Sequence, residues 1–428
     1  MSSFHIGEFG STPDSPLGHI DFDRMLKDKL VRARAEMKKH SLGAIICLNE
    51  ANVAYSSNLP PTFPGGVIGG NRYSILPVEG EPVGFDECNT AFVLRNQLKN
   101  VRVEYSVPAW GGPFLASALG AQDYLMKEFA DQMYTILKEY KLHKEKIGID
   151  SYIPPMIEAL KKAGLDVTYD GAKALLDART IKTPMELECI RSLASVIDGC
   201  FATMARTLRV GISEYEVWAK CVGFAIENGL SVNGGFIASG PHTWPKDNSR
   251  QASSRRMRPG DIVYADFFSF GFFGYRSCCY RTFSIGKTSR GVHETYARVY
   301  GWLKDAEKTV RPGATTKDIV QNWPEDTALW AKKPPFINSP KERLSTFWMN
   351  MGHAIGLSLY EPPFFWAPVA NKWPQPIHKD TAIALETLDA TPDGRAGVRL
   401  EDMIIVTEGG HEVVSRWPVE EITEVPLY

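Results

Sequence analysis

The 428-residue sequence has no excess of charge of either sign and no long apolar run. Lysine and arginine number 48 against 50 aspartate and glutamate, a formal net charge of −2, which gives no electrostatic basis for binding nucleic acid or an anionic membrane. No window approaches the roughly 18 apolar residues of a membrane span, and the N-terminus lacks the basic and apolar segments of a secretion signal. We therefore expect a cytoplasmic protein without nucleic-acid or membrane partners.

The seven cysteines also lack the pattern of a disulfide framework or a zinc finger. Their number is odd, and a chain of this length can bury full hydrophobic cores without covalent cross-links. Cys47, Cys189, Cys200 and Cys221 stand within apolar helix or strand patterns. We expect these four to be reduced packing residues.

What the chain does contain is two successive mixtures of helical and strand patterns. Residues 1–20 are rich in glycine, serine and proline and are predicted to form a loose arm. Residues 21–175 alternate helical segments with short apolar runs, among which 52–55 and 72–78 are predicted strands. Residues 176–428 begin with amphipathic helices and continue with further apolar strands, so we expect a second domain from residue 176.

Four segments of the second domain carry titratable side chains inside apolar strand patterns. In the first, a strand over 262–266 ends in Asp266, and a second strand is predicted to begin at Gly274 and to bring Cys278 nearby. The other segments surround His353, Glu386 and Glu401. A buried carboxylate or imidazole is costly unless it is paired or binds a metal. A hydrogen-bonded polar core is the alternative to a metal site.

In content and order these four segments resemble the motifs of the pita-bread hydrolases, the superfamily of aminopeptidase P, prolidase, methionine aminopeptidase and creatinase. The resemblance implies an α+β fold: a creatinase-like N-terminal α/β domain over 21–175 and a C-terminal pita-bread domain over 176–428, in which helices cover a curved antiparallel sheet. It also implies a homodimer, because relatives assemble the pocket from both subunits. The metal ligands that it implies are Asp266, Cys278, His353, Glu386 and Glu401.

Cys278 stands where the family has an aspartate that bridges two metals. One sulfur cannot bridge two metals as the two oxygens of a carboxylate do, so the sequence favours a single divalent ion. Zinc or iron would suit a site that includes the sulfur, and manganese would suit a site made of the oxygen ligands and the imidazole. Two alternatives remain open. Cys278 could be a small buried filler beside Cys279, and the site could hold no metal, as in creatinase, with His353 acting as a base.

The spacing of the first motif resembles that of the pita-bread dimethylsulfoniopropionate lyases. Those lyases have further aspartates where this chain has Phe268 and Leu359, so their mechanism does not carry over intact. The peptidases have a second histidine where this chain has Tyr360, and Asp247 stands near the place of their substrate-facing histidine. Proline-peptidase activity is therefore not expected.

The leading hypothesis is an enzyme that hydrolyses a C–N bond of a small polar molecule with the help of a bound metal. One alternative is a lyase that performs β-elimination on a small zwitterion, with Tyr360, Asp389 or Asp247 as the base. Another is a metal-free creatinase-like enzyme or a binding or biosynthetic accessory protein with a decayed site. The predicted catalytic residues are His353, Tyr360 and His242.

Aromatic and arginine residues near the motifs are the predicted substrate-binding groups. An aromatic ring face could receive a cationic substrate, and an arginine could hold a carboxylate in a bidentate contact. Arg255 and Arg256 are further arginines of this kind, although for each of the three, Arg276 included, a surface ion pair is the favoured role. The predicted substrate-binding residues are Trp244, Tyr275, Arg276 and Phe268.

Overall fold

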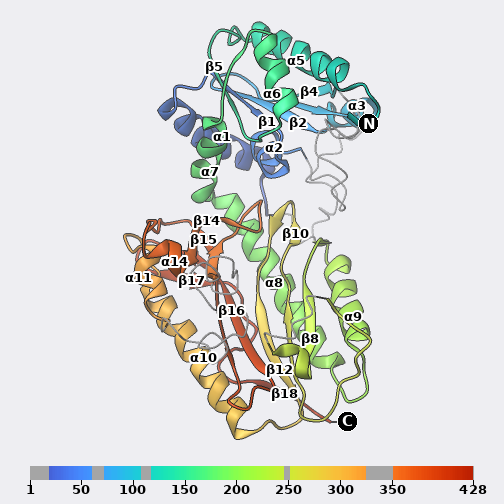
Figure 1. Ribbon diagram of the computed structural model, residues 1–428, viewed down its shortest axis with the longest axis vertical. Helices are drawn as coiled ribbons and strands as arrows, with labels where there is room; N and C mark the ends of the chain where they lie inside the picture. The colour runs from blue at the N-terminus through green and yellow to red at the C-terminus, as the bar shows by residue number, and fades with distance from the viewer. Residues whose placement is uncertain (1–18, 60–71, 108–116, 245–250, 324–349, 428) are drawn as a thin grey trace. The chain divides into compact units, whose positions relative to one another are not determined.

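The computed structural model describes residues 19–59, 72–107, 117–244, 251–323 and 350–427 (Figure 1). Nearly all of the predicted arm, and Asp247, lie outside these residues. The chain divides into two compact units, Met1–Glu186 and Leu187–Tyr428. The division comes after the boundary expected at residue 175, because that residue belongs to helix α7 (Asp170–Thr180), which packs against α1 and β5 of the first unit. Among the described helices, none combines the length and apolar character needed to cross a bilayer.

The first unit is built on a six-stranded mixed sheet with the strand order β4-β3-β2-β1-β5-β6. Its central strand β1 is buried along its whole length, as its continuous apolar run requires. The strands are β1 (Ala44–Cys47), β2 (Tyr73–Pro77), β3 (Val83–Asp86), β4 (Arg102–Tyr105), β5 (Lys146–Ile149) and β6 (Asp166–Thr168). The helices besides α7 are α1 (Phe22–Lys39), α2 (Glu50–Ser57), α3 (Cys88–Leu94), α5 (Gln122–Glu139) and α6 (Pro154–Lys162).

The strand predicted over residues 52–55 is wrong, because this segment lies within helix α2. The Asn49 side chain accepts a hydrogen bond from the Ala51 backbone N–H at 3.0 Å and so caps the helix N-terminus. Glu50 adds a negative charge in the first turn, where the helix dipole favours it. The cap outweighs the strand propensity of Val53 and Tyr55.

The second unit contains a four-stranded sheet in the order β18-β12-β9-β8 and a five-stranded sheet in the order β14-β13-β15-β16-β17. A small sheet of β11, β10 and β7 accompanies them. The strands are β7 (Ser231–Val232), β8 (Phe236–Ser239), β9 (Ile262–Asp266), β10 (Phe270–Phe272), β11 (Tyr275–Arg276), β12 (Tyr280–Ile285), β13 (Asn350–Ala354), β14 (Glu361–Trp366), β15 (Ala382–Ala390), β16 (Gly397–Val406), β17 (His411–Val413) and β18 (Thr423–Val425). The helices are α8 (Pro184–Thr207), α9 (Glu214–Glu227), α10 (Arg290–Thr309), α11 (Thr316–Val320), α14 (Ala367–Ala370) and the 3₁₀ turn η2 (Gly240–Thr243).

Helix α10 covers one face of strands β15 and β16 (Figure 1). Because side chains alternate along a strand, Leu385 and Leu400 point toward this helix and join the core with Val299 and Leu303. Glu386 and Glu401 therefore point to the opposite face, where they stand directly across from each other in the antiparallel register. The strand alternation thus places two carboxylates side by side on the face away from α10.

The connection between β9 and β12 is less simple than the single hairpin predicted from the sequence. The predicted strand from Gly274 is interrupted: β10 and β11 form a small side hairpin around Phe273 and Gly274, both at positive φ, and β12 begins only at Tyr280. Tyr280 pairs with Asp266, so the chain returns to the end of β9 all the same. Cys278 lies just before this pairing begins.

Candidate metal centre

Three buried side chains from separate segments of the second unit meet on the face away from α10. One donor atom from each of Cys278, His353 and Glu401 lies within 4.8 Å of the donors of the other two. His353 on β13 pairs with Ala384, two residues before Glu386 on β15, and therefore shares the face of the two glutamates. A sulfur, an imidazole nitrogen and a carboxylate oxygen at such separations form a donor set suited to one zinc or iron ion.

The His353 ring is oriented by the backbone. Its Nδ1 lies 3.0 Å from the carbonyl oxygen of Ala354, so an Nδ1–H donates to this carbonyl and Nε2 carries the lone pair. Burial lowers the pKa of His353, although the carbonyls of Ala354 and Leu359 and the charge of Glu386 oppose this shift. The neutral imidazole that results is the form that binds a metal.

Glu401 is the member of the cluster that most needs a partner. It is fully buried, and neither of its carboxylate oxygens has a partner in ordinary hydrogen-bonding geometry among the described residues. Burial raises the pKa of Glu401 well above its usual value, and the negative charges of Glu386 and Asp266 raise it further. A cation beside Glu401 would offset both costs, so the residues present fit a bound metal ion.

Asp266 and Cys278 face each other at the edge of the cluster, with 4.0 Å between Oδ1 and Sγ. Burial raises the pKa of Asp266 to about 8, against the opposing effects of a hydrogen bond from Tyr280 and the charge of Arg399. Burial also raises the pKa of the Cys278 thiol, and the charges of Glu401 and Asp266 add to this rise. The cluster and its neighbours therefore bring several acidic groups together in a buried place, and the charge of Arg399 offsets only part of the cost for Asp266 and Glu401.

Arg399 is a buried residue beside the candidate site that the sequence analysis did not identify. Its Nη2 donates to Glu386 Oε2, and its guanidinium lies 3.8 Å from the ring centroid of Tyr280. One ring face of Tyr280 is thus covered by a cation of the protein itself. The signal was present in the sequence, since an arginine two residues before Glu401 in an apolar strand must share its face.

Replacing Arg399 with methionine should destabilise the metal-free protein by about 3–5 kcal/mol, because Glu386 would remain buried without its partner. The measurement is urea unfolding in the presence of a chelator. Arg191→Met is the control: Arg191 pairs with Glu412, but both side chains are about one-third exposed, so that loss should stay within about 1 kcal/mol. Equal losses in the two variants would contradict the structural role of Arg399.

Tyr360 lies beside the cluster. Its ring contacts that of His353 with 4.5 Å between centroids and an angle of 68° between planes. Burial raises the pKa of Tyr360, and the nearby acidic groups led by Cys278 and Glu386 raise it further. The residue is nevertheless 43% exposed, so it lies between the buried donors and solvent.

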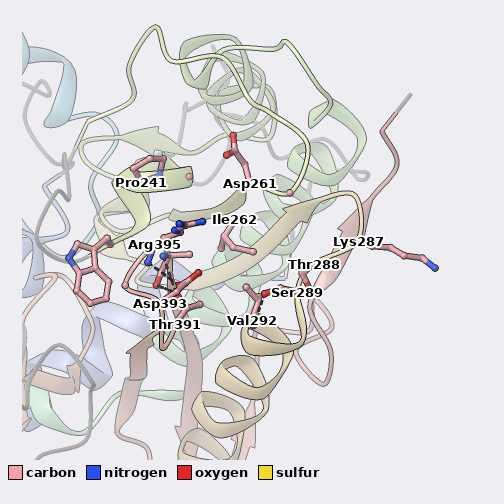
Figure 2. Close-up of a pocket in the computed structure, with 15 residues that line it drawn as sticks. Pro241, Asp261, Ile262, Lys287, Thr288, Ser289, Val292, Thr391, Asp393 and Arg395 are labelled. Carbon is pink, nitrogen blue, oxygen red and sulfur yellow. Dashed lines mark hydrogen bonds between the residues drawn. The ribbon is translucent and has the colours of Figure 1, made fainter.

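His242 and Trp244 lie away from the cluster. Strand β8 pairs with β9 so that Phe236 faces Asp266 and Ser239 faces Val263, which puts η2 and His242 at the far end of β9, roughly 10 Å along the strand at 3.3 Å per residue. Trp244 lines a pocket of about 510 Å³ with Pro241 and Arg395, and none of the cluster residues is among its lining (Figure 2).

The remaining predicted substrate-binding residues lie around the side hairpin. Phe268 packs beside the aromatic cluster of Phe236, Tyr264 and Tyr280. Tyr275 is buried and pairs with Phe272 in the small sheet. The backbone N–H of Arg276 donates to the Gly356 carbonyl at 2.7 Å, so this hairpin lies against the segment that follows His353.

Three other candidates are engaged elsewhere. The Arg255 guanidinium holds both carboxylate oxygens of Asp261, at 2.7 and 2.9 Å, and Arg256 is a largely exposed residue that donates to the Gly211 carbonyl. Asp389 is one of the bases considered for elimination. It lies on the same strand as Glu386 but an odd number of residues away, so its side chain points to the opposite face, toward α10. There it pairs with Arg298 at 2.7 Å, so the structure removes Asp389 from the candidate bases.

Comparison with known proteins identifies the family. Residues 188–408, half of the chain, match the model of metallopeptidase family M24. The chain belongs to this family. The resemblance inferred from the four motifs is thereby confirmed, as is the expectation that the protein is an enzyme of that superfamily.

Named relatives include peptidases and a lyase. The chain is 29% identical over 250 residues to the probable dipeptidase PepE of Mycobacterium bovis, a match that spans 58% of this chain and 62% of PepE. It is 25% identical over 405 residues to the Xaa-Pro dipeptidase of Pyrococcus furiosus, covering 90% of this chain and 97% of that protein. It is also 20% identical over 303 residues to the dimethylsulfoniopropionate lyase DddP of Roseobacter denitrificans, covering 68% and 64% of the two chains.

Solved structures show the same fold. The Xaa-Pro dipeptidase from Bacillus anthracis superposes with a TM-score of 0.71 at 22% identity, over 93% of this chain and 99% of that one. The predicted α+β architecture, a creatinase-like α/β unit followed by a pita-bread unit, is therefore confirmed. M24 enzymes use divalent metals, and the Cys278–His353–Glu401 cluster is where this chain could hold one.

Proposed function

We propose that this M24 protein is a one-metal enzyme that hydrolyses a C–N bond in a small polar substrate. The observation that carries the proposal is the state of Glu401, a fully buried carboxylate with no ordinary hydrogen-bond partner among the described residues, within 4.8 Å of a thiol and an imidazole. Burial of such a group is expensive unless a cation compensates it. Cys278, His353 and Glu401 would hold the ion, and zinc or iron best suits a set that includes sulfur.

A bound divalent ion in this site would supply Lewis acidity toward a substrate oxygen or a water molecule. The chain's own residues do the rest. Arg399 keeps Glu386 oriented through its contact with Oε2. Asp266 adds a carboxylate whose Oδ1 lies 4.0 Å from the Cys278 sulfur, at the edge of the cluster. Tyr360, whose ring contacts that of His353 and which is 43% exposed, would orient a substrate or pass a proton.

The choice of a small polar substrate follows from departures from the peptidase motifs. Tyr360 replaces the second histidine of the peptidases, and a thiol replaces the bridging carboxylate. Elimination on a zwitterion is the second candidate, and it is favoured by the Asp266–Cys278 spacing and the likeness to DddP. Of its candidate bases within the described residues, the structure leaves Tyr360 beside the cluster.

Metal removal tests the proposal. Chelation should abolish turnover, and one equivalent of zinc or ferrous ion should restore it, because the donor set accommodates a single ion. Turnover should be assayed on small amides and amidines, on Xaa-Pro dipeptides, and on dimethylsulfoniopropionate with detection of dimethyl sulfide. Restored turnover of only the dipeptides would refute the non-peptidase proposal, and full activity after chelation would refute the metal-assisted one.

The proposal includes a homodimer in the cytoplasm, as the resemblance to pita-bread enzymes suggests. Sedimentation equilibrium of the full chain distinguishes a dimer from a monomer. A monomer with full turnover would show that one copy of the chain completes the active site by itself.

A further inference from the structure

A second network of buried charges lies on the α10 side of the sheet, directly across from the metal cluster. Arg281 of β12 is 1% exposed and its Nη2 lies 2.6 Å from Oδ1 of Asp402, a fully buried residue of β16. Asp402 also accepts a hydrogen bond from Ser415 Oγ at 2.7 Å and pairs with Lys304 of α10 at 3.0 Å. Asp402 is the residue after Glu401, so the network begins one peptide bond from a candidate metal ligand.

The other donors of Arg281 reach the main chain. Nε donates to the Trp417 carbonyl at 3.2 Å, and Nη1 donates to the carbonyl of Tyr280 at 2.9 Å and to the carbonyl of Glu401. The Cys279 thiol donates to the same Glu401 carbonyl at 3.2 Å. Two side chains of the β12 segment therefore hold the backbone of the residue that supplies the carboxylate.

These contacts take the place of a strand ladder. In the described part of the chain, β12 and β16 belong to different hydrogen-bonded sheets. Cys278 precedes β12, and Glu401 lies on β16. The distance between the Cys278 sulfur and the Glu401 carboxylate therefore depends on side-chain hydrogen bonds between the two segments. Thr282 contributes one such connection, since its Oγ1 accepts from the Arg399 N–H at 3.0 Å and donates to the Arg399 carbonyl at 2.7 Å.

We propose that Arg281 is a positioning residue for the metal centre, which fixes the Glu401 backbone against the Cys278 end of β12. The inference rests on the proposed one-metal site. The planar guanidinium of Arg281 donates to Asp402, the Glu401 carbonyl and the Trp417 carbonyl at the same time. The ammonium of a lysine is a compact charge and cannot reach all three acceptors.

The test is a titration of the metal-free protein with Co²⁺, followed by its absorption spectrum. The native chain should bind about one equivalent and show a near-ultraviolet charge-transfer band from the Cys278 thiolate. Arg281→Lys keeps the charge but loses the fork, so its dissociation constant for Co²⁺ should rise about 10–100-fold, the usual cost of losing a partner that orients a ligand. Its charge-transfer band should weaken at saturating Co²⁺, an effect that a purely structural role would not produce.

Arg298→Lys is the matched control. Arg298 pairs with Asp389, a buried aspartate on the same α10-facing side of the neighbouring strand, and its hydrogen bonds within the described part of the chain go to Asp389 and Thr295 rather than to the backbone of a candidate ligand. This variant should bind Co²⁺ as the native chain does. Circular dichroism and a thermal transition establish that each variant is folded before titration.

The outcomes separate the two proposals. A native chain that shows no Co²⁺ binding, or no thiolate band, refutes the one-metal site itself. Suppose that the native chain shows the thiolate charge-transfer band, and that the folded Arg281→Lys variant has the same Co²⁺ affinity and the same spectrum. That result refutes the positioning role of Arg281 but not the one-metal site. If Arg281→Lys does not fold, Ser415→Ala removes one hydrogen bond to Asp402 and leaves both charge pairs intact; about fivefold weaker binding is expected, and unchanged binding overturns the inference.

Discussion

The substitution Cys278→Ala should reduce the metal content from about one ion per chain to below about one-tenth of an ion per chain. The thiolate is one of three donors in the cluster, and loss of even an indirect partner of a metal site costs about 10–100-fold in affinity, so loss of a direct donor should cost more. Because metal-assisted polarisation is worth several kcal/mol, kcat/KM should fall about 1,000-fold. Elemental analysis and steady-state kinetics on protein purified without added metal measure both effects.

Cys200→Ala is the control for this experiment. Cys200 is also a fully buried thiol, but it lies on α8 beside the carbonyl of Cys221, away from the cluster residues. This variant should lose some stability through the cavity that it creates while it keeps its metal content and turnover. If both variants keep their metal, Cys278 is a packing residue, which is the alternative left open by the sequence.

The substitution Cys278→Asp should raise the metal content from about one ion per chain to about two ions per chain. A carboxylate offers two oxygens that can bridge ions roughly 3.5–4 Å apart, which the single sulfur cannot do. Asp266, whose Oδ1 lies 4.0 Å from the Cys278 sulfur, would then face a bridging group, as in the related two-metal hydrolases. Elemental analysis with manganese or zinc in excess, after removal of loosely bound ions, gives the stoichiometry.

Cys278→Asn is matched to this variant in shape but lacks the negative charge. It should bind no more than one ion, because an amide cannot bridge two cations as a carboxylate does. Two ions in the asparagine variant would show that the other carboxylates alone define the stoichiometry. One ion in the aspartate variant would show that the thiol is not what limits this site to a single metal.

Local patterns were sufficient for the elements that carry the site. The strands that carry Asp266, Glu386 and Glu401 are mainly apolar segments that contain a few charged residues, and all three are buried along their whole length. Helix α2 was mistaken because a short segment with Val53 and Tyr55 has strand propensity, whereas its cap at Asn49 decides the outcome. Propensity is a weak guide where one hydrogen bond can reverse it.

The candidate site was predictable in part for the same reason. Alternation along a strand puts Glu386 and Glu401 on one face and Asp389 on the other, so strand parity alone would have excluded Asp389 and indicated Arg399. The placement of His242 and Trp244 at the far end of β9 depends instead on the register of β8 against β9, which no local pattern specifies. Register is a property of the paired strands.

The sequence by itself determined the family, the order of the segments that carry the acidic and imidazole groups, and the presence of a thiol at the position where the resemblance implies a bridging aspartate. These are properties of short segments, which the chain encodes directly. Only the tertiary structure decided that Cys278, His353 and Glu401 converge, that Arg399 neutralises Glu386, and that Arg281 ties β12 to β16. Such contacts join residues that lie up to 123 positions apart along the chain, and only the packing of separate sheets determines the distances between their atoms.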